Sequence, residues 1–242
     1  MIKNDNLEGK CEYLIYLINT DDVTTYSTQM DLVHEIYQVG ESAQIQLLAI
    51  LLDRYNAKTI IMNSVDGTIF ELLLKSNNPA IKDKLNQYLS NGIVKLISDY
   101  DINYLPLQKL LLCKQFQKAD MLTQSLLCNL SQKAGHHNRP WLYFTDVRSL
   151  PTVDLRTIDQ LWQVHSEGLF GLSVQKRIWL STNSNWERFW TKIGWKVNNV
   201  SCRYPQEFIW NMTAPEGHLP LFNQLRGVQV LAALFDHPAF YT

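Results

Sequence analysis

The chain has 242 residues and a mass of 28.1 kDa, and hydrophobic residues make up 46% of it. This is enough apolar material for one large core or two modest ones. Lysine and arginine together number 22 against 23 acidic residues, so no overall positive field attracts nucleic acid, and general nucleic-acid binding is disfavoured. All seven tryptophans lie between Trp141 and Trp210, and that stretch is either a dense core or an aromatic ligand site.

The cysteines and the apolar runs bear on compartment and membrane insertion. The longest apolar runs, 13–18 and 47–52, are far shorter than the ~20 residues of a membrane-spanning helix, so no transmembrane segment is expected. The N-terminus lacks a signal or transit pattern, and we expect the protein to act where it is made. No C-x-x-C pair occurs, which predicts free thiols in a reducing compartment for Cys11, Cys113, Cys128 and Cys202.

The first part of the chain has helical spacing of its apolar residues, interrupted by recognisable stops. Gly40 ends one helix, and 45–52 is apolar on nearly every side, which favours a helix buried within a bundle. Asn78 followed by Pro79 is a helix start with a capping side chain. We therefore predict an N-terminal bundle of four to six helices over residues 1–98.

A polar segment at 98–101 marks the expected boundary, with a second domain over 102–242. Helices starting at Leu107 and Phe116 are expected to pack as a hairpin. Asp120 lies beside the apolar stripe of the second helix. A solvated or capping role is the favoured interpretation of this carboxylate, and a buried organiser of a neighbouring loop is the alternative.

A loop of about 20 residues, 131–151, follows this hairpin, and structureless loops of such length are usually functional or disordered. Trp141 and Phe144 lie in it, and rings in a loop need either a core or a ligand to cover them. The adjacent pair His136-His137 does not point to a metal, because no cysteine or acid is spaced for tetrahedral ligation.

Helical patterns return in the last third of the chain. A helix is predicted over 152–165, with Asp154 as a capping side chain, and a tight turn then places Phe170 inward. The glycine-rich nucleotide-binding patterns G-x-x-x-x-G-K-[ST] and G-x-G-x-x-G are both absent from the sequence. Ser184 to Glu187 is typical of a capping box, and it opens a helix whose rings are spaced more like core than like a ligand site.

Beyond Trp195 the chain is expected to be irregular, with a rigid loop at 214–220 and a final helix at 221–235 that carries Arg226. No nucleophile, metal-binding helix or paired carboxylate motif is present, so an enzyme is disfavoured. An apolar cleft rimmed by a few cations would suit a flat hydrophobic molecule that bears carboxylates. Most of the isolated cations are expected to be solvated: Arg156, Lys176, Arg177, Lys196, Arg203 and Arg226.

Five motifs in order resemble a known family. They are Ala119-Asp120-x-x-Thr123, Asp154-Leu155-Arg156-Thr157-Ile158-Asp159-x-Leu161-Trp162, Phe170-Gly171-Leu172-Ser173-Val174-Gln175-x-x-Ile178-Trp179, Gly194-Trp195 and Ala214-Pro215-x-Gly217-His218-Leu219-Pro220. Over about residues 102–221 the chain closely resembles the genomes uncoupled four family, tetrapyrrole-binding regulators of magnesium chelatase. The first half resembles the N-terminal bundle of cyanobacterial and algal members.

The resemblance implies an all-α fold, with a mostly helical porphyrin-binding core that has long loops. It implies that the ligand is protoporphyrin IX or Mg-protoporphyrin IX, with a bilin as an open alternative, that nothing is covalently bound, and that the protein performs no covalent step. The implied partner is the large porphyrin-binding subunit of magnesium chelatase. The implied location is the plastid stroma, for a plastid-encoded chain, or the cyanobacterial cytoplasm, with peripheral association to thylakoid or envelope membranes.

The candidate ligand-binding residues come partly from the motifs and partly from the loops. By the resemblance, Phe170, Trp179 and Trp195 line or support the apolar site, and the 214–220 loop borders it. The family uses basic residues of a mobile loop for the propionates, but no lysine or arginine lies between Tyr204 and Gln224, so this role falls to Arg203 or Arg226. The full set is Trp141, Phe144, Phe170, Trp179, Trp190, Trp195, Arg203, His218 and Arg226.

Two other functions stay open at this point. The chain could be a helical scaffold or adaptor that binds protein partners through its first half, with the aromatic residues as core. It could also be an enzyme that acts on tetrapyrroles, which would require product formation without the chelatase. The scaffold hypothesis predicts that replacing Phe170 or Trp195 by alanine unfolds the protein.

Overall fold

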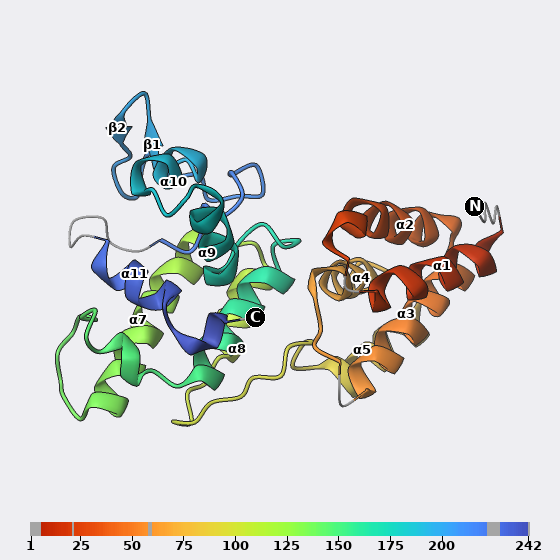
Figure 1. Cartoon of the computed structure of the whole chain (residues 1–242). Coiled ribbons are helices and arrows are strands. Elements are labelled where there is room, and N and C mark those ends of the chain that lie inside the picture. The colour runs from red at the N-terminus through yellow and green to blue at the C-terminus, as the bar shows by residue number, and fades with distance from the viewer. Residues whose placement is uncertain (1–5, 21, 58–59, 222–227, 242) are drawn as a thin grey trace. The chain divides into compact units, whose positions relative to one another are not determined.

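The computed structural model describes residues 6–20, 22–57, 60–221 and 228–241, and the chain divides into two compact units, 1–93 and 94–242 (Figure 1). Eleven α-helices and one two-stranded sheet are found in these described ranges. The predicted all-α fold class is therefore confirmed.

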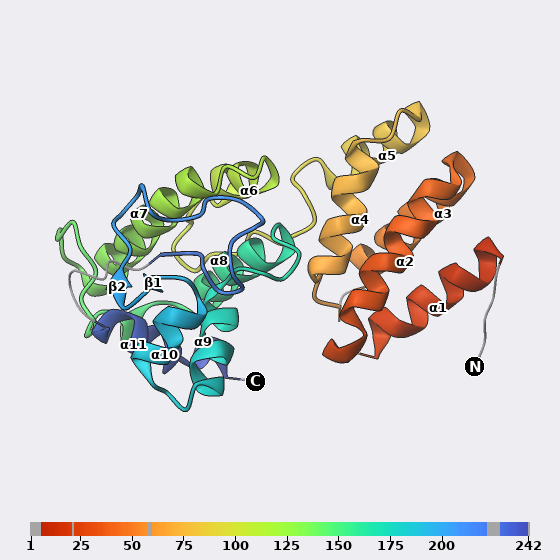
Figure 2. The same ribbon diagram turned by 90° about the horizontal axis from the view of Figure 1, so that it is seen from above.

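The described residues of the first unit form a bundle of five helices, within the predicted range of four to six. The second helix along the chain contacts the first, third and fourth, as Figure 2 shows. Its apolar face is Val33 and Ile36, which are fully buried. The helices are α1 (Leu7–Asn19), α2 (Tyr26–Val39), α3 (Glu41–Asn56), α4 (Ser64–Leu74) and α5 (Pro79–Leu89), with a short 3-10 turn η1 (Val23–Thr25) before α2.

Two sequence predictions for this bundle are confirmed and one is wrong. Gly40 separates α2 from α3 with a φ of 127°, a conformation that glycine adopts readily. The side chain of Asn78 caps α5 by accepting from the backbone N–H groups of Ala80 and Ile81. The helix around 45–52 is not buried on all sides, because Ile45 is exposed while Leu47 and Leu51 face the core.

A buried ion pair in this bundle has no signal in the sequence pattern. The Arg54 guanidinium donates two hydrogen bonds to the Asp66 carboxylate, over 2.7 and 3.0 Å. Asp66 is also the N3 residue of a capping box at the start of α4 and accepts from the backbone N–H of Asn63. The pair thus links α3 to α4 inside the bundle, where breaking one partner would leave the other charge unpaired.

The second unit contains six α-helices, two 3-10 turns and the small sheet among its described residues. Helices α6 and α7 lie side by side as the predicted hairpin. The elements are α6 (Leu105–Leu112), α7 (Phe116–Gly135), η2 (Val147–Ser149), α8 (Thr152–Val164), α9 (Leu172–Ser181), α10 (Trp186–Lys192), β1 (Lys196–Val197), β2 (Val200–Ser201), α11 (Gln229–Phe235) and η4 (Pro238–Phe240).

The structure corrects four local predictions in this unit. Helix α7 continues to Gly135, so the loop after it is shorter than predicted. Asn185, rather than Ser184, caps α10 by accepting from the Arg188 backbone N–H. Residues 196–201, expected to be irregular, form a hairpin whose turn, Asn198-Asn199, has two positive φ angles, which two-residue hairpin turns favour. The final helix begins at Gln229 rather than at 221, and 222–227 lie outside the described residues.

Asp154 was expected to cap α8, but Pro151 occupies the cap position and has no side-chain cap bond. The Asp154 carboxylate is instead buried, and it accepts from the Tyr104 hydroxyl at 2.6 Å and from the Asp99 backbone N–H at 2.9 Å. Burial and the nearby Asp154 carboxylate raise the pKa of Tyr104 above its usual value, so the phenol stays protonated and donates. Asp154 thereby fastens the segment before α6 to α8.

Asp159 organises the start of α9 in the same way. It accepts from the Ser173 backbone N–H at 3.0 Å and from the Gln163 side-chain amide at 2.8 Å. Gly171, just before the helix, has a φ of 141°, and a Cβ there would lie 2.8 Å from the Asp159 carboxylate oxygen. The glycine of this motif is therefore required by a close approach of a buried carboxylate.

No helix in the described ranges is long and apolar enough to cross a membrane.

Candidate functional site

The loop that follows α7 is fastened along the last turns of that helix. The side-chain amide of Gln132 donates to the Arg139 carbonyl at 2.8 Å, and the Ser131 hydroxyl lies 3.1 Å from Nε2 of His137. The Cys128 thiol contacts the Pro140 carbonyl at 3.9 Å. These contacts hold residues 137–140 against α7 and leave the residues after Pro140 to project from it.

Asp146 closes the loop from its other end. Its carboxylate accepts from the Arg139 guanidinium at 2.8 Å and from the Tyr143 backbone N–H at 3.1 Å, and it lies 3.7 Å from Nε2 of His137. Ser131 and Asp146 thus both approach the same ring nitrogen of His137. A catalytic triad needs the acid and the nucleophile on opposite nitrogens, so this Ser, His and Asp group is a loop fastening.

This anchoring presents a run of exposed rings. The exposed fractions of Trp141, Tyr143 and Phe144 are 37%, 46% and 42%, and the rings of Trp141 and Tyr143 meet edge to face with centroids 6.4 Å apart. Large rings are costly to leave in water, so a ligand that covers them would be stabilised. The predicted site residues Trp141 and Phe144 are brought together here, on one loop.

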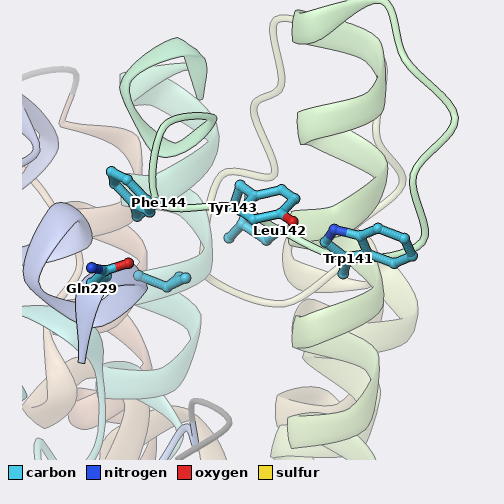
Figure 3. Close-up of a pocket in the computed structure, with 6 residues that line it drawn as sticks. Trp141, Leu142, Tyr143, Phe144 and Gln229 are labelled. Atoms are coloured by element: carbon cyan, nitrogen blue, oxygen red, sulfur yellow. The ribbon is translucent and has the colours of Figure 1, made fainter. Parts of the chain in front are cut away.

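A cavity of about 410 Å³ opens beside these rings (Figure 3). Residues 141–144 form one wall, and the first residues of α11 form the other. Among the residues that the structure describes, its lining has no charged side chain: Trp141, Leu142, Tyr143, Phe144, Gln229 and Val230. Leu142 and Tyr143 lie between two predicted site residues, whereas Gln229 and Val230 were missed because no local pattern links α11 to this loop. We call these six residues the aromatic cavity.

The chain that leads toward α11 is held by a buried carboxylate on α7. Asp120 is completely buried, and it accepts from the Leu221 backbone N–H at 2.6 Å and from the Gln124 amide at 3.1 Å. The favoured interpretation of Asp120 as a solvated or capping residue is wrong, and it organises a distant loop. Burial raises the pKa of Asp120 to about 7, while its two hydrogen bonds act in the opposite direction.

Three of the predicted site residues lie in the core instead of on a surface. Phe170 is fully buried, with its ring 5.2 Å from Phe116 and 6.4 Å from Trp162, measured between centroids. Trp195 is 1% exposed, and its indole N–H donates to the His218 carbonyl at 2.8 Å. In this conformation neither ring offers a face to a ligand, and both support the fold around the site.

His218 is the third of these buried residues. Its Nδ1 lies 2.6 Å from the Ile193 carbonyl, and its Nε2 accepts from the Ile209 backbone N–H at 3.0 Å. These partners set a neutral ring that carries its proton on Nδ1. Burial lowers the pKa of His218, although the bond to Ile193 acts in the opposite direction. Both nitrogens are occupied, so this histidine cannot also ligate a metal from where it lies.

Trp179 and Trp190 belong to a different group of rings. Trp186 is at its centre, with ring centroids 5.3 Å from Trp179, 6.3 Å from Trp190 and 6.1 Å from Phe235. The cluster joins α9, α10 and the end of α11, and both predicted residues are partly exposed. Neither lines the aromatic cavity.

Of the two cations predicted for the carboxylates, Arg203 is described by the structure and does not line the cavity. Arg203 is exposed, and its backbone N–H donates to the Glu207 carboxylate at 2.7 Å. Arg226 lies outside the described residues. In the part of the chain that the structure describes, no three His, Cys, Asp or Glu side chains are grouped to hold a metal ion.

Residues 97–238 match the family model described as GUN4-like, the family that the sequence motifs resemble. The chain belongs to the GUN4-like family. The ycf53 protein of Pyropia yezoensis is 47% identical over 213 residues, which cover 88% of this chain and 89% of that protein. The chloroplastic tetrapyrrole-binding protein of Arabidopsis thaliana is 39% identical over 145 residues, 56% of this chain and 54% of that protein.

A solved structure of the family shares the fold of part of this chain. GUN4 from Chlamydomonas reinhardtii aligns with a TM-score of 0.56 and 40% identity, over 61% of this chain and 96% of that one. Several family motif residues have structural roles here: Asp120, Asp159, Gln175 and His218 all hold loops in place. Gln175 does so by donating to the carbonyls of Gly217 and Pro220 at 2.9 and 2.8 Å.

Proposed function

We propose that this protein binds a tetrapyrrole in the aromatic cavity without forming a covalent bond to it. The observation that carries the proposal is the run of exposed rings at Trp141, Tyr143 and Phe144 beside a cavity whose described lining residues are uncharged. A flat, largely apolar macrocycle can cover such rings, and each 100 Å² of apolar surface removed from water contributes about 2.5 kcal/mol before entropic losses. The printed name of the Arabidopsis relative supports this ligand class.

Within that class we propose protoporphyrin IX or Mg-protoporphyrin IX as the ligand, with a bilin as the competing candidate. The rings of Trp141, Tyr143 and Phe144 are 37% to 46% exposed, so a macrocycle larger than the cavity can rest partly outside it. Binding and release are the whole of the proposed chemistry, because the titratable groups that we describe near the cavity are used in holding loops.

We further propose that the bound porphyrin is delivered to, or shielded at, the large porphyrin-binding subunit of magnesium chelatase. The protein would then stimulate metal insertion while performing no covalent step itself. The proposed location is the plastid stroma or a cyanobacterial cytoplasm, with peripheral contact to thylakoid or envelope membranes. The membership of the GUN4-like family and the chloroplastic relative support this placement.

The test is a titration with deuteroporphyrin, a water-tolerant porphyrin, followed by quenching of tryptophan fluorescence. We expect saturable quenching at micromolar or lower concentration, and a parallel titration with a bilin ranks the two ligand classes. A second series adds the large chelatase subunit and measures the rate of magnesium insertion with and without this protein. An unchanged emission spectrum across the range would refute porphyrin binding, and an unchanged insertion rate would refute the regulatory role alone.

A further inference from the structure

We propose that Arg139 is the cation of the aromatic cavity, and that it selects ligands with a free carboxylate. This inference rests on the proposed function and concerns how the same site distinguishes its ligands. The family resemblance assigns this role to Arg203 or Arg226; Arg203 does not line the cavity, and Arg226 lies outside the described residues.

The position of Arg139 is set by the ring beside it. Arg139 does not itself line the cavity, but its guanidinium carbon lies 5.0 Å from the centre of the ring of Tyr143, which does. A guanidinium stacked on a ring is attracted to its face and loses little hydration there. Arg139 is also the only lysine or arginine between Lys133 and Arg148, so no other cation of this loop competes for the place.

The orientation of Arg139 is set by Asp146. Nη2 of the guanidinium donates to Oδ1 of Asp146 at 2.8 Å, and this carboxylate also holds the Tyr143 backbone N–H. One acid therefore holds both the backbone of Tyr143 and the cation beside the Tyr143 ring. A guanidinium has five N–H donors, and its bond to Asp146 uses the Nη2 end. The side chain is 34% exposed, which leaves donors open to a second carboxylate.

Four other cations singled out from the sequence are engaged elsewhere. The Lys176 ammonium donates to the Phe240 carbonyl at 3.0 Å, and Arg156 donates to the Ala239 carbonyl at 3.2 Å, so both hold the C-terminal segment. Arg177 pairs with Glu216 and Lys196 pairs with Glu187. Arg139, by contrast, is partly exposed, and both its acidic partner Asp146 and its neighbouring ring Tyr143 belong to the loop that forms the cavity wall.

A porphyrin that keeps or lacks its carboxylates separates charge recognition from loop shape. Deuteroporphyrin and its dimethyl ester are titrated under identical detergent conditions against the full-length protein, by quenching of tryptophan fluorescence. The wild-type protein is expected to bind the free acid about tenfold more tightly than the diester, since charge-assisted hydrogen bonds are lost on esterification. Arg139→Gln is expected to remove that preference while leaving the affinity for the diester nearly unchanged, and Arg139→Lys to restore part of it.

The matched control is Arg148→Gln, an exposed arginine on η2 that does not line the cavity, and it is expected to keep the tenfold preference. If Arg139→Gln weakens both ligands equally, Arg139 only shapes the loop and the proposal is overturned. If the variant retains the wild-type preference, another residue recognises the carboxylate. If the wild type has no preference, no residue recognises it. In both cases this proposal fails while porphyrin binding stands. If the wild-type protein binds neither porphyrin, both the proposed function and this proposal are refuted.

Discussion

Two groups of aromatic residues in the second unit have similar chemistry and opposite surroundings. Phe116, Trp162 and Phe170 pack against one another with almost no exposed surface, and the Trp162 indole N–H donates to the Thr123 hydroxyl. The rings of the aromatic cavity are 37% to 46% exposed and stand on a loop held by polar contacts. The first group holds the fold together and the second is available to a ligand, so substitutions in the two groups should separate stability from binding.

Replacing Phe170 by alanine should have the largest effect. The side chain is fully buried between two other rings, so truncation leaves a cavity that neighbouring helices cannot readily fill. We expect the free energy of unfolding to fall by about 3–5 kcal/mol. Chemical denaturation of the purified protein, followed by far-ultraviolet circular dichroism, measures this change.

A matched substitution is Phe170→Leu, which retains most of the buried volume and should cost well under half as much. Porphyrin affinity of the folded fraction should change little in Phe170→Leu, because the ring faces the core. A variant that unfolds normally but no longer binds porphyrin would show that Phe170 contacts the ligand and that its position here is not the bound one.

The second prediction concerns pH and the loop that leads to the cavity. Burial raises the pKa of Asp120 to about 7, so the folded protein holds a proton that the unfolded chain releases near the ordinary value of 3.8. The stability that this group contributes is greatest below pH 4 and is lost as the pH rises through 7. Asp120→Asn does not titrate and keeps an oxygen for the Leu221 backbone N–H. Its free energy of unfolding relative to the wild type should therefore rise by about 2 kcal/mol from pH 5 to pH 7.

Urea denaturation of both proteins at half-unit pH intervals measures that difference, and all other titrating groups cancel between them. Asp154→Asn serves as a comparison, since the same chemical change is made at a buried carboxylate whose donors are a phenol and a backbone N–H. The free energies of unfolding of Asp120→Asn and the wild type could instead differ by a constant amount from pH 5 to pH 7. That result would mean that Asp120 has its ordinary pKa in the folded protein.

The helical architecture was predictable from the sequence because it depends on local spacing, as Gly40 and the Asn78 cap show. The roles of the buried carboxylates were not predictable in the same way. Asp120 and Leu221 are about one hundred positions apart, and Asp154 meets Asp99 across more than fifty. A window of ten or twenty residues contains one partner of each pair, so Asp154 resembled a helix cap and Asp120 a surface acid.

The candidate site shows the same division. Trp141 and Phe144 could be proposed from the sequence because rings in a loop need a core or a ligand to cover them, which is a local signal. The opposite wall, Gln229 and Val230, belongs to a helix that the pattern started too early, and nothing in its composition indicates a cavity. Phe170, Trp195 and His218 carry strong family motifs, and the structure places all three in the core. In this chain these motif residues support the fold and hold loops around the candidate site.

The smallest effect on stability, with a clear effect on binding, is expected for Phe144→Ala. The ring is 42% exposed and lines the cavity, so its removal costs the folded protein little and takes covering surface from the ligand. We expect deuteroporphyrin affinity to fall about tenfold, equivalent to about 1.4 kcal/mol, with a melting temperature within two degrees or so of the wild type. Leu180→Ala is the matched control, because Leu180 is a 53% exposed apolar residue on α9 that does not line the cavity. Equal affinities for the two variants would move the ligand away from these rings, and a large fall in the melting temperature of Phe144→Ala would assign the exposed group to the same structural role as the buried one.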